Sequence, residues 1–155
     1  MDEYEKMTEK YEIASRWKRL WASLLDCIIM MIVIVPIMFF TGAFGATAQG
    51  VKPSITYTLA MGLIGLIVFA LINFKLLISN GQTVGKKIFK IKIVTLNGEL
   101  PELKNHILKR YLVFFLPGQL PVIGQIFSIV NILFIFGKQK RCIHDFAAKT
   151  TVIVN

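Results

Sequence analysis

The sequence has little charge in its longest apolar runs, and this scarcity excludes an ordinary soluble domain. Residues 20–41 contain one charged side chain, Asp26, residues 55–78 contain one, Lys75, and residues 111–136 contain none. Runs of about 18 or more nearly uncharged apolar residues are typical of membrane-spanning helices. In a chain of 155 residues that is 55% hydrophobic, three such runs leave too little polar surface to cover them in water. We therefore expect a membrane protein.

Motifs that carry chemistry are equally scarce. Cys27 and Cys142 lie far apart and outside any Cys-x-x-Cys or Cys/His ligand spacing, so we expect reduced thiols and no metal site. Gly81 and Gly85 are separated by three residues and Lys follows Lys86, whereas a phosphate-binding loop needs four residues between its glycines and Ser or Thr after its Lys. No nucleophile accompanies a general base, so the sequence predicts neither an enzyme nor a cofactor.

The net charge of +9 would suggest a nucleic-acid partner in a soluble protein, but a membrane protein offers a simpler source. The cytoplasmic flanks of membrane helices gather Lys and Arg, and anionic lipid head groups attract them. The partners that we expect are therefore the lipid bilayer and anionic lipid head groups, and no nucleic acid.

The apolar runs divide the chain into a cytoplasmic N-terminal segment at 1–16 and a single transmembrane domain at 17–155. We expect spans at 17–41, 55–78 and 107–136, a cytoplasmic loop at 79–106 and a cytoplasmic tail at 137–155. The N-terminal flank, the loop and the tail are rich in Lys and Arg, which predicts a multi-pass protein of the cell membrane with a cytoplasmic N-terminus. Ala46-Thr47-Ala48 fits a signal-peptide cleavage site, but the apolar run before it is too long for a cleaved leader, so we expect a retained helix.

The third apolar region, 107–136, is long for one crossing and short for two, because a crossing needs about 20 residues. Pro117, Gly118 and Pro121 interrupt it. One crossing, two crossings and re-entry all stay open at this point, and the interruption favours a broken or re-entrant helical hairpin.

Short polar elements complete the expected fold. Residues 88–96 alternate imperfectly between Lys and apolar side chains, which predicts a strand, and residues 151–154 form a candidate partner strand. Asn97 and Gly98 are a strong turn signal, and residues 1–16 suit an exposed amphipathic or frayed helix. The fold class is therefore an all-α membrane protein, a transmembrane helical bundle with a small cytoplasmic β-ribbon.

Polar side chains at similar depth in the apolar runs suggest an intramembrane site. Arg19 and Asp26 lie seven residues apart, which places them on one face of a helix. A carboxylate at the depth of Asp26 costs about 2.5–3.5 kcal/mol unless something offsets it. Unlike charges at this depth predict one intramembrane polar cluster, comprising Arg19, Asp26, Asn73, Lys75 and Arg110.

Two interpretations of this cluster stay open. Either the cations extend to the head groups while Asp26 is paired for stability, or Asp26 binds a cation or a proton on a transport path, as intramembrane ionisable residues often do. A second acid, Asp145, allows a similar choice. It begins a short helix at 145–149 as its N-cap, or its carboxylate binds the guanidinium of Arg110 or Arg141.

Several of these residues recur in an order and spacing that resemble the RDD family, over about residues 14–154. The matching motifs are Arg19-x-x-Ala22-x-x-x-Asp26, Gly81-Gln82-Thr83-x-Gly85-Lys86, Ile91-x-Ile93-Val94 with Gly98, Arg110, and His144-Asp145-x-x-Ala148-x-Thr150-x-Val152. The resemblance implies that Arg19, Asp26 and Asp145 are the one Arg and two Asp for which the family is named. The chain departs from the family at Lys149, where Gly is frequent, and at Lys75, which is no family signature. The cytoplasmic motif residues that we carry forward are Gly81, Gln82, Thr83, Gly85, Lys86, His144, Asp145 and Thr150.

The resemblance implies a bacterial membrane protein, and some members of the family look like cation/proton exchangers. We therefore expect a transporter such as a cation/proton exchanger that uses the intramembrane Arg/Asp cluster, with cations or protons as partners and a homo-oligomer to complete the path. The alternative is a non-catalytic membrane interaction or assembly module that binds a protein partner or anionic lipid. Its cytoplasmic ribbon would dock the partner, and its basic face would hold lipid through Lys86, Lys87, Lys90 and Lys92.

Overall fold

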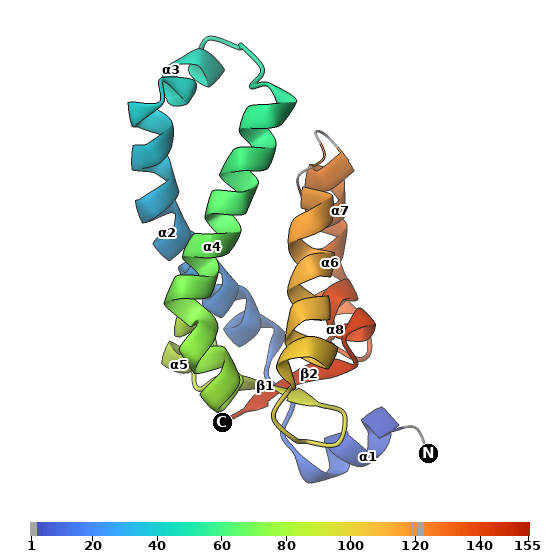
Figure 1. The fold of residues 1–155 in the computed structure, drawn as a ribbon. Coiled ribbons are helices and arrows are strands. Elements are labelled where there is room, and N and C mark those ends of the chain that lie inside the picture. Colours follow the sequence, from blue (N-terminus) through green and yellow to red (C-terminus); the bar gives the residue numbers. More distant parts are fainter. Residues whose placement is uncertain (1–2, 119, 121–122) are drawn as a thin grey trace.

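The computed structural model describes residues 3–118, 120 and 123–155, and most of them are helical. The elements gather into a long helical hairpin, a short helical hairpin and a polar end (Figure 1). The long hairpin consists of α2, the short helix α3 and α4, at Arg16–Phe40, Ala43–Ala48 and Ile55–Asn80. The short hairpin consists of α6 and α7, at Leu108–Gly118 and Ile123–Leu133. The polar end holds α1 at Glu3–Lys10, α5 at Val84–Ile88, β1 at Ile91–Thr95, α8 at Ile143–Ala147 and β2 at Thr150–Val154.

The two long helices begin and end at signals in the sequence. Ser15 caps α2 and Ser54 caps α4, each by accepting a hydrogen bond from a backbone amide of the first turn. α4 ends at Gly81, whose φ of +65° is the left-handed conformation that glycine adopts readily. The helices predicted at 17–41 and 55–78 are confirmed to within a few residues.

Both long helices have the length and composition of membrane spans. Their most apolar windows reach mean hydropathies of 2.6 in α2 and 2.3 in α4. None of the α2 window and 17% of the α4 window is buried inside the protein, so neither resembles the core helix of a soluble domain. Phe40, Ile55 and Leu71 are 86%, 74% and 80% exposed. These apolar faces fit a membrane protein.

The third apolar region forms the short hairpin. α6 and α7 have 11 residues each and lie side by side (Figure 1). At 1.5 Å per residue each is about 17 Å long, shorter than a hydrocarbon core of about 30 Å. A π-helical turn at Leu103–Ile107 precedes α6, and a 3-10 turn at Phe134–Phe136 follows α7. Of the predicted interruption, Pro117 and Gly118 lie in the last turn of α6, and Pro121 lies outside the described residues.

The β-ribbon joins the two predicted strands. β1 and β2 pair antiparallel over all five residues of each strand. The strand predicted at 88–96 is wrong over its first residues, because residue 88 closes α5 and Lys90 takes a left-handed φ of +54°. The turn predicted at Asn97 and Gly98 is confirmed, since Gly98 has a φ of +84° and its N–H donates to the Thr95 carbonyl.

Both edges of the ribbon are bonded by other parts of the chain. Residues 12–14 line the outer edge of β2, where the Ala14 N–H donates to the Val152 carbonyl over 3.0 Å. On the outer edge of β1, the Ile93 N–H donates to the Gly81 carbonyl over 2.7 Å. The ribbon therefore connects the N-terminal segment to the end of α4.

The buried core lies at the polar end. It is formed by side chains of the ribbon and the long helices, including Ile91, Ile93, Val152, Ala22 and Leu77. α1 packs on the other face of the ribbon through Met7, which is 3% exposed. The helix predicted within 1–16 is thus present and is anchored by one buried side chain. This core holds the segments that carry the polar residues in fixed positions.

Candidate functional site

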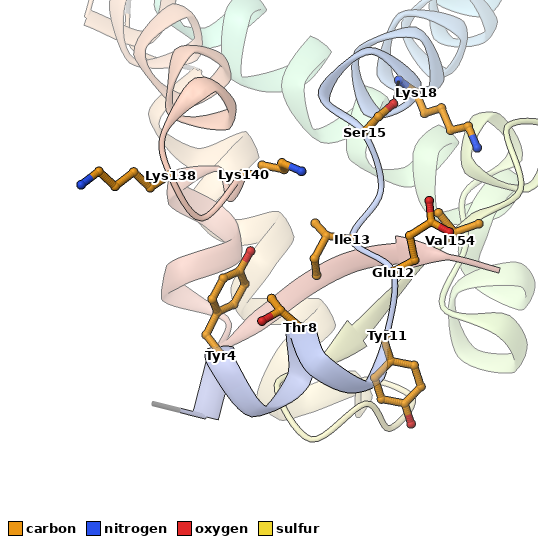
Figure 2. A pocket seen from close by; sticks show the side chains of 10 residues that line it. All are labelled: Tyr4, Thr8, Tyr11, Glu12, Ile13, Ser15, Lys18, Lys138, Lys140 and Val154. Carbon is orange, nitrogen blue, oxygen red and sulfur yellow. Dashed lines mark hydrogen bonds between the residues drawn. The ribbon is translucent and has the colours of Figure 1, made fainter. Parts of the chain in front are cut away.

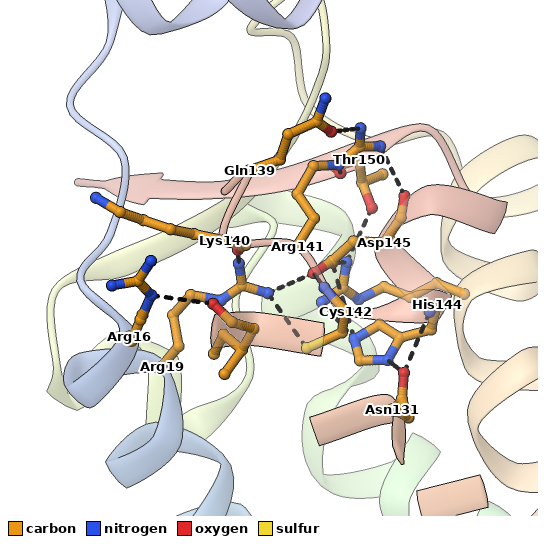
Figure 3. A network of polar contacts seen from close by, with 12 residues as sticks. Arg16, Arg19, Asn131, Gln139, Lys140, Arg141, Cys142, His144, Asp145 and Thr150 are labelled. Carbon is orange, nitrogen blue, oxygen red and sulfur yellow. Dashed lines mark hydrogen bonds and ion pairs between the residues drawn. The ribbon is translucent and has the colours of Figure 1, made fainter. Parts of the chain in front are cut away.

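A buried carboxylate lies where α2, α6 and α8 meet. Asp145 of α8 is fully buried and is bound by the guanidinium group of Arg19, near the start of α2 (Figure 3). The guanidinium group of Arg110, near the start of α6, binds the same carboxylate. Arg19 also donates to the Lys140 carbonyl, and Arg110 donates to the Thr150 hydroxyl over 2.8 Å. We call Arg19, Arg110 and Asp145 the arginine clamp, because it ties three helices and the ribbon to one carboxylate.

Asp145 also organises the start of its own helix. The Cys142 amide donates to its carboxylate over 2.8 Å, so Cys142 is the N-cap and Asp145 is the third residue of α8. The prediction that Asp145 is the N-cap is therefore wrong, because the helix already begins at Ile143. Of the two arginines considered, Arg110 binds the carboxylate, whereas Arg141 donates to backbone carbonyls of α8 and β2 at 3.1 and 3.0 Å.

The charge on Asp145 is fixed by its surroundings. Burial on its own would raise the pKa of this carboxyl, but Arg110 and Arg19 hold the pKa well below its usual range. Cys142, His144 and Asp145 offer ligand atoms within 4.8 Å of one another, but two guanidinium groups already occupy the carboxylate. The arrangement favours a structural ion-pair network over a metal centre.

His144 is held neutral beside the arginine clamp. Burial and the Arg110 charge lower the pKa of His144 to about 3. Its Nδ1 lies 3.0 Å from the Asn131 Oδ1 and its Nε2 lies 3.1 Å from Arg110, which fits a neutral ring that donates from Nδ1 and accepts at Nε2. Sequence reasoning missed Asn131, which is 1% exposed in α7. The available signal was an amide within an uncharged apolar run.

A second carboxylate, that of Asp26, lies about two turns beyond Arg19 along α2 and has different partners. The Thr83 hydroxyl donates to it over 2.5 Å and the Gly85 N–H over 2.7 Å. The Lys86 ammonium lies 3.9 Å from the same carboxylate, which is an ion pair without a direct hydrogen bond. Gly85 permits this close approach of α5 to α2, since a Cβ there would collide with the Ala22 carbonyl oxygen.

Hydrogen bonds from residues of the motif and from α4 fix the segment 81–86 that carries these donors. Thr83 caps α5. Asn73 of α4 accepts a hydrogen bond from the Val84 N–H over 3.0 Å, and the Gln82 side chain donates to a β1 carbonyl over 3.0 Å. The segment is thereby held against α2, α4 and the ribbon, and the carboxylate of Asp26 is oriented by preorganised donors.

A cavity of about 270 Å³ lies beside Asp26. Asp26, Thr83 and Lys86 contribute polar groups to its lining, and Arg110 and His144 reach it from the neighbouring network. Most of the remaining lining is apolar, with side chains that include Cys27, Met30, Phe69, Tyr111, Phe114 and Phe115. The side chain of Asp26 is 13% exposed, whereas that of Asp145 is 0% exposed. Of the two carboxylates, only Asp26 therefore borders open space.

The order of these residues along the chain matches a known family. The model described as RDD family matches residues 13–149, a range that includes both carboxylates. The chain belongs to the RDD family. Searches of the curated proteins and of the solved structures returned no match.

In this RDD family protein the predicted five-residue cluster is divided between two places. Its two arginines belong to the arginine clamp, whereas Asp26 and Asn73 bind the segment 81–86. Lys75 belongs to neither group, because two residues along a helix correspond to a rotation of about 200° from Asn73, and it lies on an exposed face. Of the one Arg and two Asp that the resemblance implies, Arg19 and Asp145 belong to the arginine clamp and Asp26 lines the cavity.

The predicted basic face of Lys86, Lys87, Lys90 and Lys92 is only partly present in the structure. Lys87 and Lys90 are exposed and Lys92 is half-buried, but Lys86 is 8% exposed. The reason is that α5 packs against α2 at Gly85, which turns the next side chain inward toward Asp26. Burial lowers the pKa of Lys86 to about 8, although the Asp26 charge opposes this shift.

Proposed function

We propose that this RDD family protein is a multi-pass protein of the cell membrane that exchanges cations for protons at Asp26. The observation that carries the proposal is the contrast between the two carboxylates. Asp145 is fully buried and bound by two guanidinium groups, whereas Asp26 borders a cavity and has one ammonium group, Lys86, 3.9 Å away. A carboxylate beside open space in an apolar region is the natural candidate for an ion or proton path.

The distribution of apolar and polar surface supports the membrane placement. α2 and α4 leave most of their apolar windows unburied, whereas α1, α5, α8 and the ribbon lie together at one end (Figure 1). Trp17 and Trp21 near that end are 64% and 51% exposed, as expected for aromatic residues at a membrane–water interface. Because the polar segments are rich in Lys and Arg, the positive-inside rule favours a cytoplasmic location for that end and for the N-terminus.

In this arrangement α2 and α4 cross the bilayer and the shorter α6–α7 hairpin re-enters it. A re-entrant hairpin keeps residues 137–155 on the same side as residues 79–106, which agrees with their shared position beside the ribbon (Figure 1). Two crossings and a hairpin are few for alternating access, so we propose that a homo-oligomer completes the path.

The geometry offers a simple basis for exchange. The Lys86 ammonium lies near Asp26 without a direct hydrogen bond, so a cation that enters the cavity competes with it for the same carboxylate oxygens. A proton on the carboxylate competes with the cation in the same way. Binding of a cation and binding of a proton are then mutually exclusive, which couples their movements.

A membrane interaction module is the second candidate. Exposed Lys87 and Lys90 suit an anionic surface. The ribbon is less suited to docking a partner strand, because residues 12–14 and Gly81 already bond its edges.

An enzymatic role gains no support from the thiol beside His144, since burial raises the pKa of Cys142 and so weakens it as a nucleophile.

The test of the proposed function is transport by purified protein in sealed liposomes that contain a pH dye. A proton gradient is imposed, Na⁺ or K⁺ is added, and wild type is compared with Asp26→Asn and with Glu99→Gln, a control at an exposed acid away from both carboxylates. We expect cation-driven pH recovery with wild type and Glu99→Gln, and none with Asp26→Asn. No flux from folded wild type across several cations would remove the exchanger and favour the interaction module.

A further inference from the structure

A second hollow lies at the polar end, outside both carboxylate sites. This groove of about 660 Å³ lies between α1, the chain at 12–15 and the turn at 137–140 (Figure 2). Three lysines line it, Lys18 at the start of α2 and Lys138 and Lys140 in the turn, together with Glu12. Tyr4, Thr8, Tyr11 and Ser15 also line it, with the hydroxyl group of Tyr11 pointing away from the lysines (Figure 2).

The turn that carries two of the lysines is fixed by contacts to its backbone. Arg16 donates to the carbonyls of residues 135–137 over 3.3–3.4 Å. Arg19 donates to the Lys140 carbonyl, and Tyr4 of α1 donates to the Gln139 carbonyl over 2.5 Å. These contacts bring the turn to the start of α2 from a point more than 115 residues further along the chain. They use the backbone only, so the ammonium groups of the turn are left for another partner.

The groove has an excess of positive charge. Three lysines against one glutamate leave a net charge of +2 on its lining. Within the described part of the chain, the salt bridges involve other residues, and none of the three lysines has a carboxylate partner. Figure 2 shows Lys138 and Lys18 extending to opposite sides, with Lys140 between them. Their flexible four-carbon stems allow the ammonium groups to approach one anion.

Exposed aromatic residues lie close in the sequence to two lysines of this groove. Trp17 and Trp21 lie on either side of Lys18 in the sequence and are exposed, and Phe134 and Phe136, just before Lys138, are 48% and 50% exposed. A free phosphate ion would make no use of these side chains. A phospholipid would use both surfaces, with its head group on the lysines and its acyl chains along the apolar helices.

We propose that this groove binds the phosphate head group of an anionic phospholipid, with Lys18, Lys138 and Lys140 as its cationic ligands. The inference rests on the proposed membrane placement, but it is independent of cation exchange at Asp26. A lipid bound there would hold α1 and the 137–140 turn at the membrane surface and so brace the start of α2.

The test is lipid binding to the full-length protein in detergent, measured by native mass spectrometry during titration. The two probes are dioleoyl phosphatidylglycerol and dioleoyl phosphatidylcholine, which share acyl chains and differ in head-group charge. The groove variant replaces Lys18, Lys138 and Lys140 with Gln. The control variant replaces three exposed lysines outside both the groove and the predicted basic face with Gln, namely Lys104, Lys109 and Lys149. A single Lys138→Glu variant, at an exposed position, provides a second probe of the groove that leaves its walls intact.

We expect wild type to bind phosphatidylglycerol more tightly than phosphatidylcholine. Each lysine near an anionic head group contributes about fivefold in affinity, so the groove variant should lose roughly 100-fold for phosphatidylglycerol. The control variant should stay within about threefold of wild type, and Lys138→Glu should lose at least about fivefold. Equal binding of the two lipids by wild type, or an equal loss in the control variant, would overturn the proposal. Neither result depends on whether the protein transports cations.

Discussion

Replacing Asp145 with Asn tests the arginine clamp. The substitution keeps the shape of the side chain and removes the charge that Arg19 and Arg110 share. Both arginines are buried, at 4% and 3% exposed, so water has little access to either guanidinium group. Asp145→Asn therefore leaves two uncompensated cations in the interior of the polar end.

The expected loss of stability is large. Removing one partner of a buried ion pair typically costs about 3–5 kcal/mol. The amide of Asn still accepts one hydrogen bond, and the Cys142 amide can keep its partner, so we expect a loss of about 3–5 kcal/mol in the free energy of unfolding. Arg19→Gln should cost less in the Asp145→Asn background than in wild type, with a coupling of about 1–3 kcal/mol, because the two residues share one contact.

The pH dependence follows from the same carboxylate. The pKa of Asp145 in the folded protein lies well below its usual range, so its contribution to stability is present above the unfolded-state pKa of about 3.9 and is lost as the pH falls further. The difference in stability between wild type and Asp145→Asn should therefore be constant from about pH 5 to pH 8 and should narrow below about pH 4.

The assay is unfolding in detergent micelles by heat or by SDS, followed by circular dichroism. Glu99→Gln is the matched control, since it removes a carboxylate from an exposed position. An Asp145→Asn variant as stable as Glu99→Gln would refute the idea that the arginine clamp holds the three helices together. A difference between wild type and Asp145→Asn that already narrows near neutral pH would refute the assignment of a strongly lowered pKa.

Two further predictions use the same unfolding assay. Lys149 has a left-handed φ of +49°, a conformation that costs an L residue about 1–2 kcal/mol. Because glycine adopts it readily but loses more conformational entropy on folding, Lys149→Gly should raise the free energy of unfolding by about 0.5–1 kcal/mol. A loss of stability in Lys149→Gly would contradict this prediction. The folded-state pKa of His144, about 3, lies below the unfolded-state pKa of about 6.5, so stability should fall as the pH drops below about 6.5, by about 1.4 kcal/mol per pH unit. His144→Gln should remove that slope, and equal slopes in the two proteins would show that His144 is not held neutral.

The long helices could be predicted because their signals are local. Uncharged apolar runs, a serine before each helix and a glycine after α4 are all visible in the sequence. The point at which β1 begins could not be predicted in the same way, because a short helix replaces the start of the predicted strand. The short helix α5 forms there because Thr83 caps it and Gly85 packs on Ala22, and the second of these contacts is tertiary.

The grouping of polar residues shows a similar limit. Sequence position indicates depth along a helix, and Arg19, Asp26 and Asn73 do lie near the polar end, but depth does not determine direction around the helix. Lys75 points to another face for this reason. The partner of Arg19 is Asp145, 126 residues away, and only the folded chain brings the two together.

Proton release on cation binding is the most direct test of exchange at Asp26. Detergent-solubilised protein is placed in weakly buffered solution with a pH indicator, at a series of pH values that extends into the acidic range, and Na⁺ or K⁺ is added at constant ionic strength. If cations and protons compete for the Asp26 carboxylate, wild type should release protons in a saturable manner and Asp26→Asn should release none. Asp145 is present in both proteins, so it does not account for a difference between them. No release from folded wild type, or equal release from wild type and Asp26→Asn, would contradict the account.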